Sequence, residues 1–274
     1  MVEDAGTEVA VGRDGGQAIR RAVALLREVS ASKAKGLGAK LSGLAEATGL
    51  TQPTAHRLLA VLLKEGLLER DSASRAYRLG PLLYEFGLAA APRVDVRRMC
   101  GPTLDRIAAE AGDTAYLNSR SGTDALCLDR REGSFEIRAL PVEVGNRRPL
   151  GVGAGALAVL ASLPPGEADL VVAANEGRYR RHGLIADKVR TAIEATRARG
   201  FAVTTGRIVA RYRGVAVAVG NGVGGVPVAL SVIAIAERLD VRRIEAVAAL
   251  LRREEAALRA AISGSLTTHK GRAA

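Results

Sequence analysis

The sequence predicts an α+β protein with two domains, a winged helix-turn-helix in the N-terminal third and a larger mixed domain after it. Residues 41–79 contain two short helical patterns joined at Gly49 and Leu50, and a compact hairpin follows them. That order of elements is typical of a winged helix-turn-helix. Beyond residue 93, amphipathic helical segments alternate with short strand-like runs, which favours a mixed domain with an antiparallel sheet. A length of 274 residues allows each domain its own core.

The first residues, MVEDAGTEVAVGRDGG, lack the basic start and apolar centre of a signal peptide. We therefore expect residues 1–15 to form a disordered arm and the protein to be cytoplasmic. An amphipathic first helix is expected from Ala18 to Ser30, with one apolar face made by Ile19, Ala22, Val23 and Leu26. The segment KAKGLGAK, residues 33–40, should be a flexible basic loop.

The helix predicted from Gln52 to Lys64 has one clear apolar face. Ala55, Leu58, Leu59 and Leu62 recur at the spacing of a helix face, which should be buried against the preceding helix at Leu41, Leu44 and Ala45. Thr51 is a favourable N-cap, and Pro53 in the first turn costs no helix hydrogen bond.

The opposite face of that helix carries polar side chains suited to base edges and phosphates. Candidate DNA contacts on it are Thr51, Gln52, Pro53, Thr54, His56, Arg57 and Lys64, of which Arg57 and Lys64 should partly bind phosphate. The hairpin of residues 66–79, with turn chemistry from Asp71 to Ser74, adds Arg75 and Arg78. A small helical module with a solvated basic face is the alternative interpretation.

Charge and cysteine content constrain the function only weakly. The net charge of +11 favours polyanionic partners, but residues 1–90 hold 12 Lys and Arg against 10 Asp and Glu, a balance of +2. The remaining 28 and 19 give +9, so the excess lies mainly outside the predicted DNA-binding domain. Cys100 and Cys127 are too few for a disulfide framework and are expected to be small core residues.

The second half should contain a linker helix, a sheet and several covering helices. Pro81 opens a short apolar helix that ends before Pro92, and a helix follows from Val94 to Ala111. Strands are expected at residues 114–118, 125–129, 135–140 and 201–203, and helices at 153–162, 167–174, 187–199 and 240–262. Residues 214–236 carry no charge, but their glycines and Pro227 favour a buried hairpin over a membrane span. We expect residues 265–274 to be a disordered tail.

Catalytic and metal-binding motifs are missing from the sequence. His56, His182 and His269 lie far apart without metal-ligand spacing, and no G-x-S-x-G or P-loop pattern occurs. The glycines of GVGAG, residues 151–155, lack the strand and acidic residue of a nucleotide-binding fingerprint. We therefore predict no catalytic residue, no metal, no cofactor and no enzymatic activity.

Several motifs together resemble those of IclR-family transcriptional regulators over residues 17 to about 262. They are LAEATGLTQPTAHRLLAVLLKEGLLERD, YRLGPLLYEFG, RRPLGVGAGALAVLA, RGFAVTTG and VPVALSVIAI. The resemblance implies a winged helix-turn-helix domain at 16–80, a linker helix at 81–92 and a GAF-like effector-binding domain at 93–264. It also implies a homodimer or homotetramer that binds palindromic double-stranded operator DNA.

The resemblance further implies where a small organic effector binds. In members that bind oxo-acids, the ligand lies against backbone amides that correspond to Gly153 and Ala154, and a helix N-terminus is a natural carboxylate site. A strand serine corresponds to Ser231, with Ile233 beside it, while Thr204 and Gly214 stand where members often have an acidic residue and a cysteine. Val215 should complete the lining. The loss of polar residues favours a larger, less polar pocket for an aromatic acid, lactone or longer-chain acid, or else a degenerate pocket.

The predicted function is therefore sequence-specific DNA binding by a transcriptional repressor whose operator affinity responds to a small acid or lactone with an apolar body. A ligand-independent regulator with a degenerate pocket is one alternative, and a small-molecule enzyme is another. A structural, nucleoid-type DNA binder is disfavoured by the size of the second domain.

Overall fold

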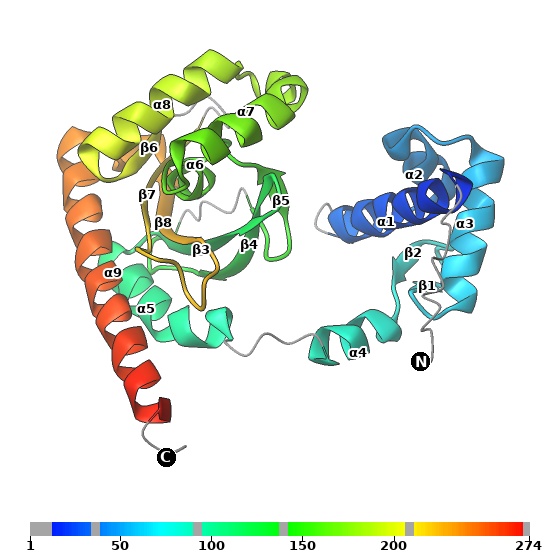
Figure 1. The fold of residues 1–274 in the computed structure, drawn as a ribbon, viewed down its shortest axis with the longest axis horizontal. Coiled ribbons are helices and arrows are strands. Elements are labelled where there is room, and N and C mark those ends of the chain that lie inside the picture. Colours follow the sequence, from blue (N-terminus) through cyan, green and yellow to red (C-terminus); the bar gives the residue numbers. More distant parts are fainter. Residues whose placement is uncertain (1–12, 34–38, 90–94, 137–141, 206–210, 271–274) are drawn as a thin grey trace, which may run out of the picture. The chain divides into compact units, whose positions relative to one another are not determined.

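The computed structural model describes residues 13–33, 39–89, 95–136, 142–205 and 211–270 (Figure 1). The chain divides into two compact units, Met1–Ala91 and Pro92–Ala274. Residues 1–12 of the predicted arm, 34–38 of the predicted loop, 90–92 of the linker and 271–274 of the tail lie outside the described residues. Among the described residues, α1 already begins at Arg13, so residues 13–15 of the predicted arm are helical.

The first unit has the winged helix-turn-helix order that the sequence predicts. Helices α1 (Arg13–Lys33), α2 (Leu41–Thr48) and α3 (Gln52–Lys64) precede a hairpin of β1 (Leu68–Arg70) and β2 (Tyr77–Leu79). Helix α4 (Pro81–Ala89) follows. Gly49 ends α2 in the left-handed conformation, with a φ of 68°, which glycine adopts without strain.

The core of this unit confirms the predicted face of α3. Ala55, Leu59 and Leu62 are buried together with Leu44 and Ala45 of α2. The end of the predicted loop is ordered, because Ala39 is buried and forms a β-bridge with Tyr77 of the wing.

The predicted apolar face of α1 is wrong in part. Ile19 is 66% exposed and Val23 is 39% exposed, whereas Leu25 and Val29 are buried. Residues 22–26 are all apolar, so the spacing of apolar residues does not identify which side of this helix is buried.

The second unit is built on one antiparallel six-stranded sheet with strand order β5-β4-β3-β8-β7-β6. The sheet contains β3 (Thr114–Ser121), β4 (Asp124–Arg131), β5 (Arg147–Pro149), β6 (Ala202–Thr205), β7 (Tyr212–Ala218) and β8 (Val228–Ile235). The uncharged stretch is the β7–β8 hairpin, as predicted. Among the described residues, no helix is long and apolar enough to cross a membrane.

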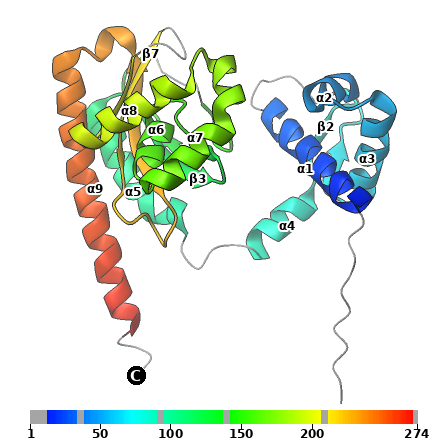
Figure 2. The ribbon, with the colours of Figure 1, turned by 45° about the horizontal axis from the view of Figure 1, so that its top comes forward.

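Helices cover both faces of this sheet (Figures 1 and 2). On one face, α5 (Val96–Ala111) and α9 (Val241–Lys270) pack over Leu117, Val215, Val217 and the even-numbered residues of β8. On the other, α6 (Ala154–Ala161), α7 (Pro165–Tyr179) and α8 (Ala186–Arg199) enclose a core with Ala125, Ala216 and Ala229. The GAF-like mixed fold is confirmed, and α6 is placed above the centre of the sheet.

Three predicted segments need correction. Phe135 and Glu136 are not in a strand, and residues 137–140 of that predicted strand lie outside the described residues. The edge strand of the sheet is instead β5, which pairs with β4. No local sequence pattern predicts this pairing. Helix α9 extends to Lys270, into the segment predicted as a disordered tail.

Candidate functional site

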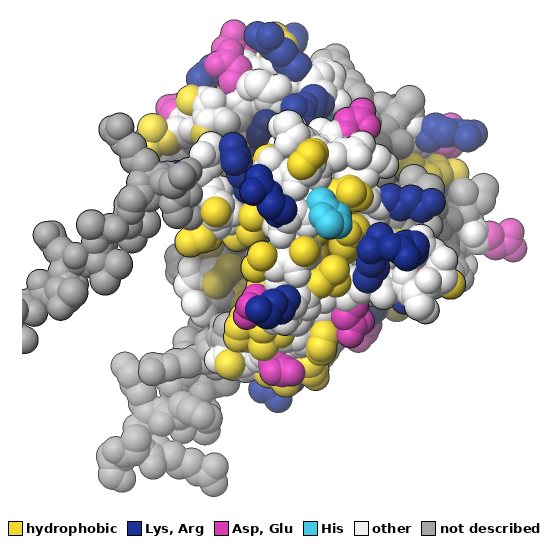
Figure 3. Space-filling view, turned by 90° about the vertical axis from the view of Figure 1, so that its right-hand side faces the viewer, with side chains coloured by type: hydrophobic (Ala, Val, Ile, Leu, Met, Phe, Trp, Pro, Cys, Tyr) yellow, Lys and Arg dark blue, Asp and Glu magenta, His cyan; other side chains and the backbone are white. Residues whose placement is uncertain are grey.

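The first candidate site is the exposed surface of α3, where the predicted DNA contacts lie. Gln52, Pro53, His56, Arg57 and Lys64 are exposed, and Thr54 is half-buried. The buried residues on the opposite face hold the helix by its apolar side, so its polar side is free to enter a groove. In Figure 3, Lys and Arg side chains on this face are spread among apolar and uncharged ones. A DNA site on this face would therefore depend on base-edge contacts more than on a concentrated charge.

The start of α3 differs slightly from the expected cap. Thr51 occupies the N-cap position, but its hydroxyl donates a hydrogen bond to the Thr54 hydroxyl at 2.9 Å and caps no backbone amide. Both hydroxyls stand at the end of the helix that enters a groove in winged helix-turn-helix proteins. The open amides of the first turn and these hydroxyls can bind a phosphate.

The wing is held by its own polar contacts. Asp71 accepts hydrogen bonds from the amide and the hydroxyl of Ser74, both at 2.7 Å, and forms an ion pair with Arg78 at 2.9 Å. Arg75 is exposed in the turn, with a left-handed backbone of φ 55°. Arg75 is therefore exposed at the tip of the wing, whereas Arg78 is held by its ion pair with Asp71 in the turn.

The second candidate site is a small cavity between the sheet and the N-terminal end of α6. It holds about 40 Å³, and four of the predicted effector residues line it: Gly153, Ala154, Ser231 and Ile233. Thr204 and Gly214 lie just beside it, since a side-chain carbon on Gly214 would be 3.1 Å from the Ala154 Cβ and 3.3 Å from the Thr204 Oγ1. Val215 is wrongly predicted, because it is buried on the opposite face of the sheet under α5 and α9.

The cavity is more polar than the sequence indicates. Sequence reasoning missed ten of the residues that line it, and five of these carry a polar group or a thiol: Tyr116, Asn118, Cys127, Asn146 and Arg148. Tyr116 and Asn118 are two residues apart on β3 and therefore share one face of the strand, a signal that could have been used. Arg148 was missed because β5 itself was missed.

Hydrogen bonding and burial define the chemistry of the cavity. The Asn118 Nδ2 donates to the Ser231 Oγ at 3.2 Å. Burial raises the pKa of the Cys127 thiol to about 12, so the thiol stays protonated and unreactive. Burial also raises the pKa of Tyr116 and lowers that of the Arg148 guanidinium. A volume of 40 Å³ admits a few waters, so an organic ligand must displace side chains as it enters.

Gly155 permits the close contact between α6 and β3. A side-chain carbon on it would be 2.2 Å from the Asn118 Nδ2. Gly155→Ala should therefore destabilise the protein by about 1–3 kcal/mol through overpacking, and Asn118→Ala in the same chain should recover most of that loss. Urea unfolding of the two single variants and the double variant measures the coupling. Gly166→Ala in α7, which meets no atom within 4 Å, is the matched control and should be neutral or stabilising. Additive effects would show that the contact is absent.

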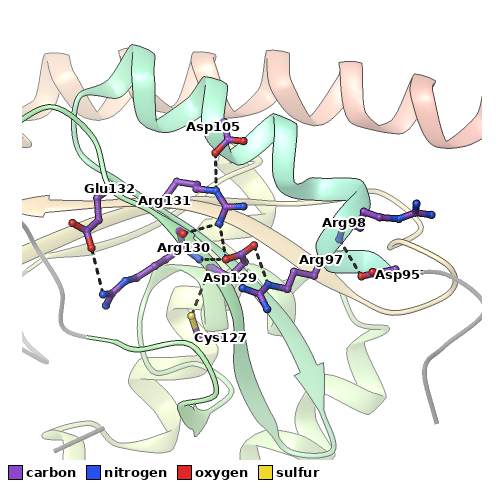
Figure 4. A network of polar contacts seen from close by, with 9 residues as sticks. All are labelled: Asp95, Arg97, Arg98, Asp105, Cys127, Asp129, Arg130, Arg131 and Glu132. Atoms are coloured by element: carbon purple, nitrogen blue, oxygen red, sulfur yellow. Dashed lines mark hydrogen bonds and ion pairs between the residues drawn. The ribbon is translucent and has the colours of Figure 1, made fainter. Parts of the chain in front are cut away.

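A bulge in β4 connects the cavity wall to the start of α5. Asn118 is opposite Cys127 and Leu117 is opposite Asp129, so Leu128 is the extra residue and the alternation of side chains reverses there. Cys127 faces the cavity, whereas Asp129 faces α5 (Figure 4). Cys127 in the cavity wall is thus two residues away from Asp129, whose ion pair with Arg97 reaches α5.

Asp129 is the centre of a network of ion pairs between β4 and α5 (Figure 4). Its carboxylate is 3% exposed and accepts from the Arg97 Nε at 3.2 Å and the Arg131 Nη1 at 2.7 Å. Burial alone would raise the pKa of Asp129, but the hydrogen bonds from Arg97 and Arg131 outweigh it, and the pKa is lowered. Arg131 also reaches Asp105 of α5 at 2.6 Å, so the network ties β4 to α5.

Asp129→Asn should lower the free energy of unfolding at pH 7 by about 1–2 kcal/mol, less than for a fully buried pair because both arginines are partly exposed. A carboxylate with a lowered folded-state pKa stabilises above its unfolded pKa, near 3.9, and this contribution disappears as the pH falls below that value. The difference between the variant and the parent should therefore shrink below about pH 4. Asp105→Asn removes an exposed carboxylate from the same arginine and should cost less. Equal losses for the two variants at pH 7 would contradict the buried role of Asp129.

The comparisons with known proteins decide the family. Residues 88–260 match the family description "Bacterial transcriptional regulator IclR C-terminal", and residues 18–72 match "IclR helix-turn-helix domain". This chain belongs to the IclR family. It is an IclR-type DNA-binding transcriptional regulator with an effector-binding C-terminal domain, and IclR-family proteins are regulators, not enzymes. Among the described residues, no group of three or more His, Cys, Asp or Glu is placed to hold a metal ion.

Curated IclR relatives and solved IclR structures agree with that assignment. The regulator KipR of Bacillus subtilis is 33% identical over 166 residues, which cover 60% of this chain and 66% of KipR. The repressor AllR of Klebsiella pneumoniae is 27% identical over 87% of each chain. An IclR-family structure from Brucella abortus has a TM-score of 0.70 at 20% identity, covering 89% and 92% of the two chains. An IclR homolog from Microbacterium hydrocarbonoxydans, complexed with 4-hydroxybenzoate, has a TM-score of 0.68 at 21% identity, covering 90% and 99%.

Proposed function

We propose that this IclR-type regulator is a sequence-specific repressor whose operator affinity is modulated by a small organic acid that enters the cavity beside α6. The observation that carries the proposal is the presence of two separate sites, an exposed polar face on α3 and a cavity at a helix N-terminus. Repression is supported by the relative named as the repressor AllR. An acid with an apolar body is supported by the 4-hydroxybenzoate in the Microbacterium homolog.

The helix N-terminus supplies the chemical basis for an acid. The first amides of α6 follow Gly153, have no partner within the helix and lie at the positive end of its dipole. Asn118 and Ser231 add polar groups at the same end, and Val152, Ala156 and Ile233 give the lining apolar surface. A few directed donors in an apolar wall are typical of small-molecule sites.

We further propose that the regulator acts as a homodimer or homotetramer joined through α4. Tyr84, Phe86 and Leu88 of that helix are 70%, 55% and 60% exposed. Three large apolar side chains on one short helix are costly to leave in water, and a two-fold operator requires two recognition helices. A second copy of this chain is the partner that satisfies both requirements.

The experiment that tests DNA recognition is selection of duplexes from a random pool by the full-length protein. The expected product is a palindrome whose half-sites are separated by about one helical turn or a multiple of it. The selected duplex should bind at least about 1,000-fold more tightly than an unselected one at physiological salt. Recovery of no common sequence would contradict sequence-specific regulation.

A ligand-independent regulator is the second candidate, and the 40 Å³ cavity favours it. A thermal-shift screen separates the two, since a ligand that binds the native state raises the melting temperature with concentration. Aromatic and medium-chain acids should stabilise the protein, and glyoxylate and pyruvate should do so less. Stabilisation by the small oxo-acids alone would overturn the proposed ligand class, and no stabilisation by any acid would favour the ligand-independent regulator.

A further inference from the structure

Helix α3 exposes an apolar side chain where the fold does not require one. Val61 is 55% exposed and is not part of the hydrophobic core of the first unit, whereas Leu58 and Leu63 on either side of it pack against that core. A β-branched residue is also a weaker helix former than Lys, Gln or Ala at an exposed position. Neither packing within this unit nor helix propensity therefore explains a valine at this position.

Val61 belongs to a row of side chains on the outward side of α3. Pro53, Arg57 and Val61 follow one another at intervals of four residues, and all three are exposed. They lie on the side of the helix away from the buried Ala55 and Leu59. Four residues rise by about 6 Å, so an apolar residue lies about one helical turn before the arginine and another about one turn after it.

The composition of α3 suits contact with the floor of a DNA groove. The helix contains no Asp or Glu between Gln52 and Lys64, so none of its own side chains repels phosphate. Apolar side chains lie among the cations on the face shown in Figure 3. In the major groove, the apolar group that a base edge offers is the C5-methyl of thymine. Burial of an exposed apolar side chain against that methyl removes both from water.

We infer that Val61 and Pro53 are specificity-determining residues that contact thymine methyl groups, so that each operator half-site carries two A·T pairs at the places facing them. The two residues are separated by about 12 Å along the helix axis, compared with a base-pair rise of about 3.4 Å, so they face different base pairs. The inference rests on the proposed sequence-specific DNA binding through α3, and it adds apolar recognition to the polar contacts of Gln52 and Arg57.

Replacement of thymine by uracil in the selected operator, one position at a time, tests the inference. Uracil keeps the base pair and its hydrogen-bonding groups and lacks only the methyl. In anisotropy measurements with the full-length protein, uracil at each of the two positions in a half-site should weaken binding about 4-fold, the value expected for one buried methyl group.

Two variants assign each methyl to a side chain. Val61→Ala should abolish the uracil penalty at one position and keep it at the other, and Pro53→Ala should do the reverse, as a double-mutant cycle between protein and DNA requires. Alanine is the better helix former at an exposed site, so Val61→Ala should melt at or above the temperature of the parent. A loss of stability therefore cannot account for its changed base preference. If Pro53→Ala does not fold, Val61→Ala still decides.

Val241→Ala is the matched control, because it makes the same change at a 79% exposed valine at the start of α9 in the second unit. It should keep both uracil penalties. An operator on which uracil has no effect at any position, or a Val61→Ala variant that keeps every penalty of the parent, would overturn the inference while leaving sequence-specific binding intact. Failure to select any operator would contradict both the inference and the proposed DNA recognition.

Discussion

Replacing Gln52 and Arg57 together by alanine should weaken binding to a selected operator by at least about 30-fold. Each base-edge contact of this kind contributes roughly 1–3 kcal/mol of discrimination, and 1.4 kcal/mol is a factor of ten in affinity. Both side chains are exposed on α3, so the fold should be unaffected. Fluorescence anisotropy with the operator and with an unselected duplex measures the loss, which should be much larger for the operator.

Lys64→Ala is the matched control for that double variant. Lys64 is exposed in the last turn of the same helix and is expected to contact phosphate. Its removal should weaken all duplexes alike and reduce the slope of log affinity against log salt by about one. If the Gln52/Arg57 variant binds the operator with the affinity of the parent, α3 does not present the assigned recognition face.

Phe86→Asp should convert the proposed dimer to a monomer of 28.5 kDa at micromolar concentration. A carboxylate at a buried apolar contact is left unpaired, and dimerisation through α4 cannot compensate that desolvation. Loss of the second recognition helix should then reduce operator affinity by at least about 100-fold, since the two half-sites no longer bind as one unit. Light scattering and anisotropy on the same sample measure both effects.

Leu170→Asp provides the comparison for Phe86→Asp. Leu170 is 73% exposed on α7 of the second unit, so the same chemical change there should leave the α4-dependent association and operator affinity unchanged. A monomeric parent protein, or a Phe86→Asp variant that stays dimeric, would refute the proposed role of α4.

Local periodicity predicts much of this fold because it reports which side of a helix or strand is buried. The spacing of Ala55, Leu59 and Leu62 gives α3 correctly, and the uncharged apolar run within residues 226–235 gives β8. Where apolar residues surround a helix, as around Leu25 in α1, periodicity cannot select the buried side. The sheet edge β5 depends on pairing with β4, which no local signal encodes.

The two candidate sites also differ in how far local sequence patterns predict them. The α3 surface is one continuous stretch of sequence, so its exposed residues could be named in advance. The cavity is assembled from four strands and the start of α6, and its missed residues, such as Asn118 and Arg148, come from elements that are distant along the chain. Val215 was placed in the cavity beside Gly214 although adjacent strand residues face opposite sides.

The most direct test is an operator titration with the full-length protein at fixed salt, with and without saturating 4-hydroxybenzoate, after calorimetry has shown that the acid binds. Coupling between a ligand site and a DNA site is typically about 5–150-fold. An effector-modulated IclR-type regulator should show an operator Kd that changes by a factor in this range, while its affinity for an unselected duplex changes little. Identical operator Kd values for the acid-free and acid-saturated protein would contradict effector control through this cavity.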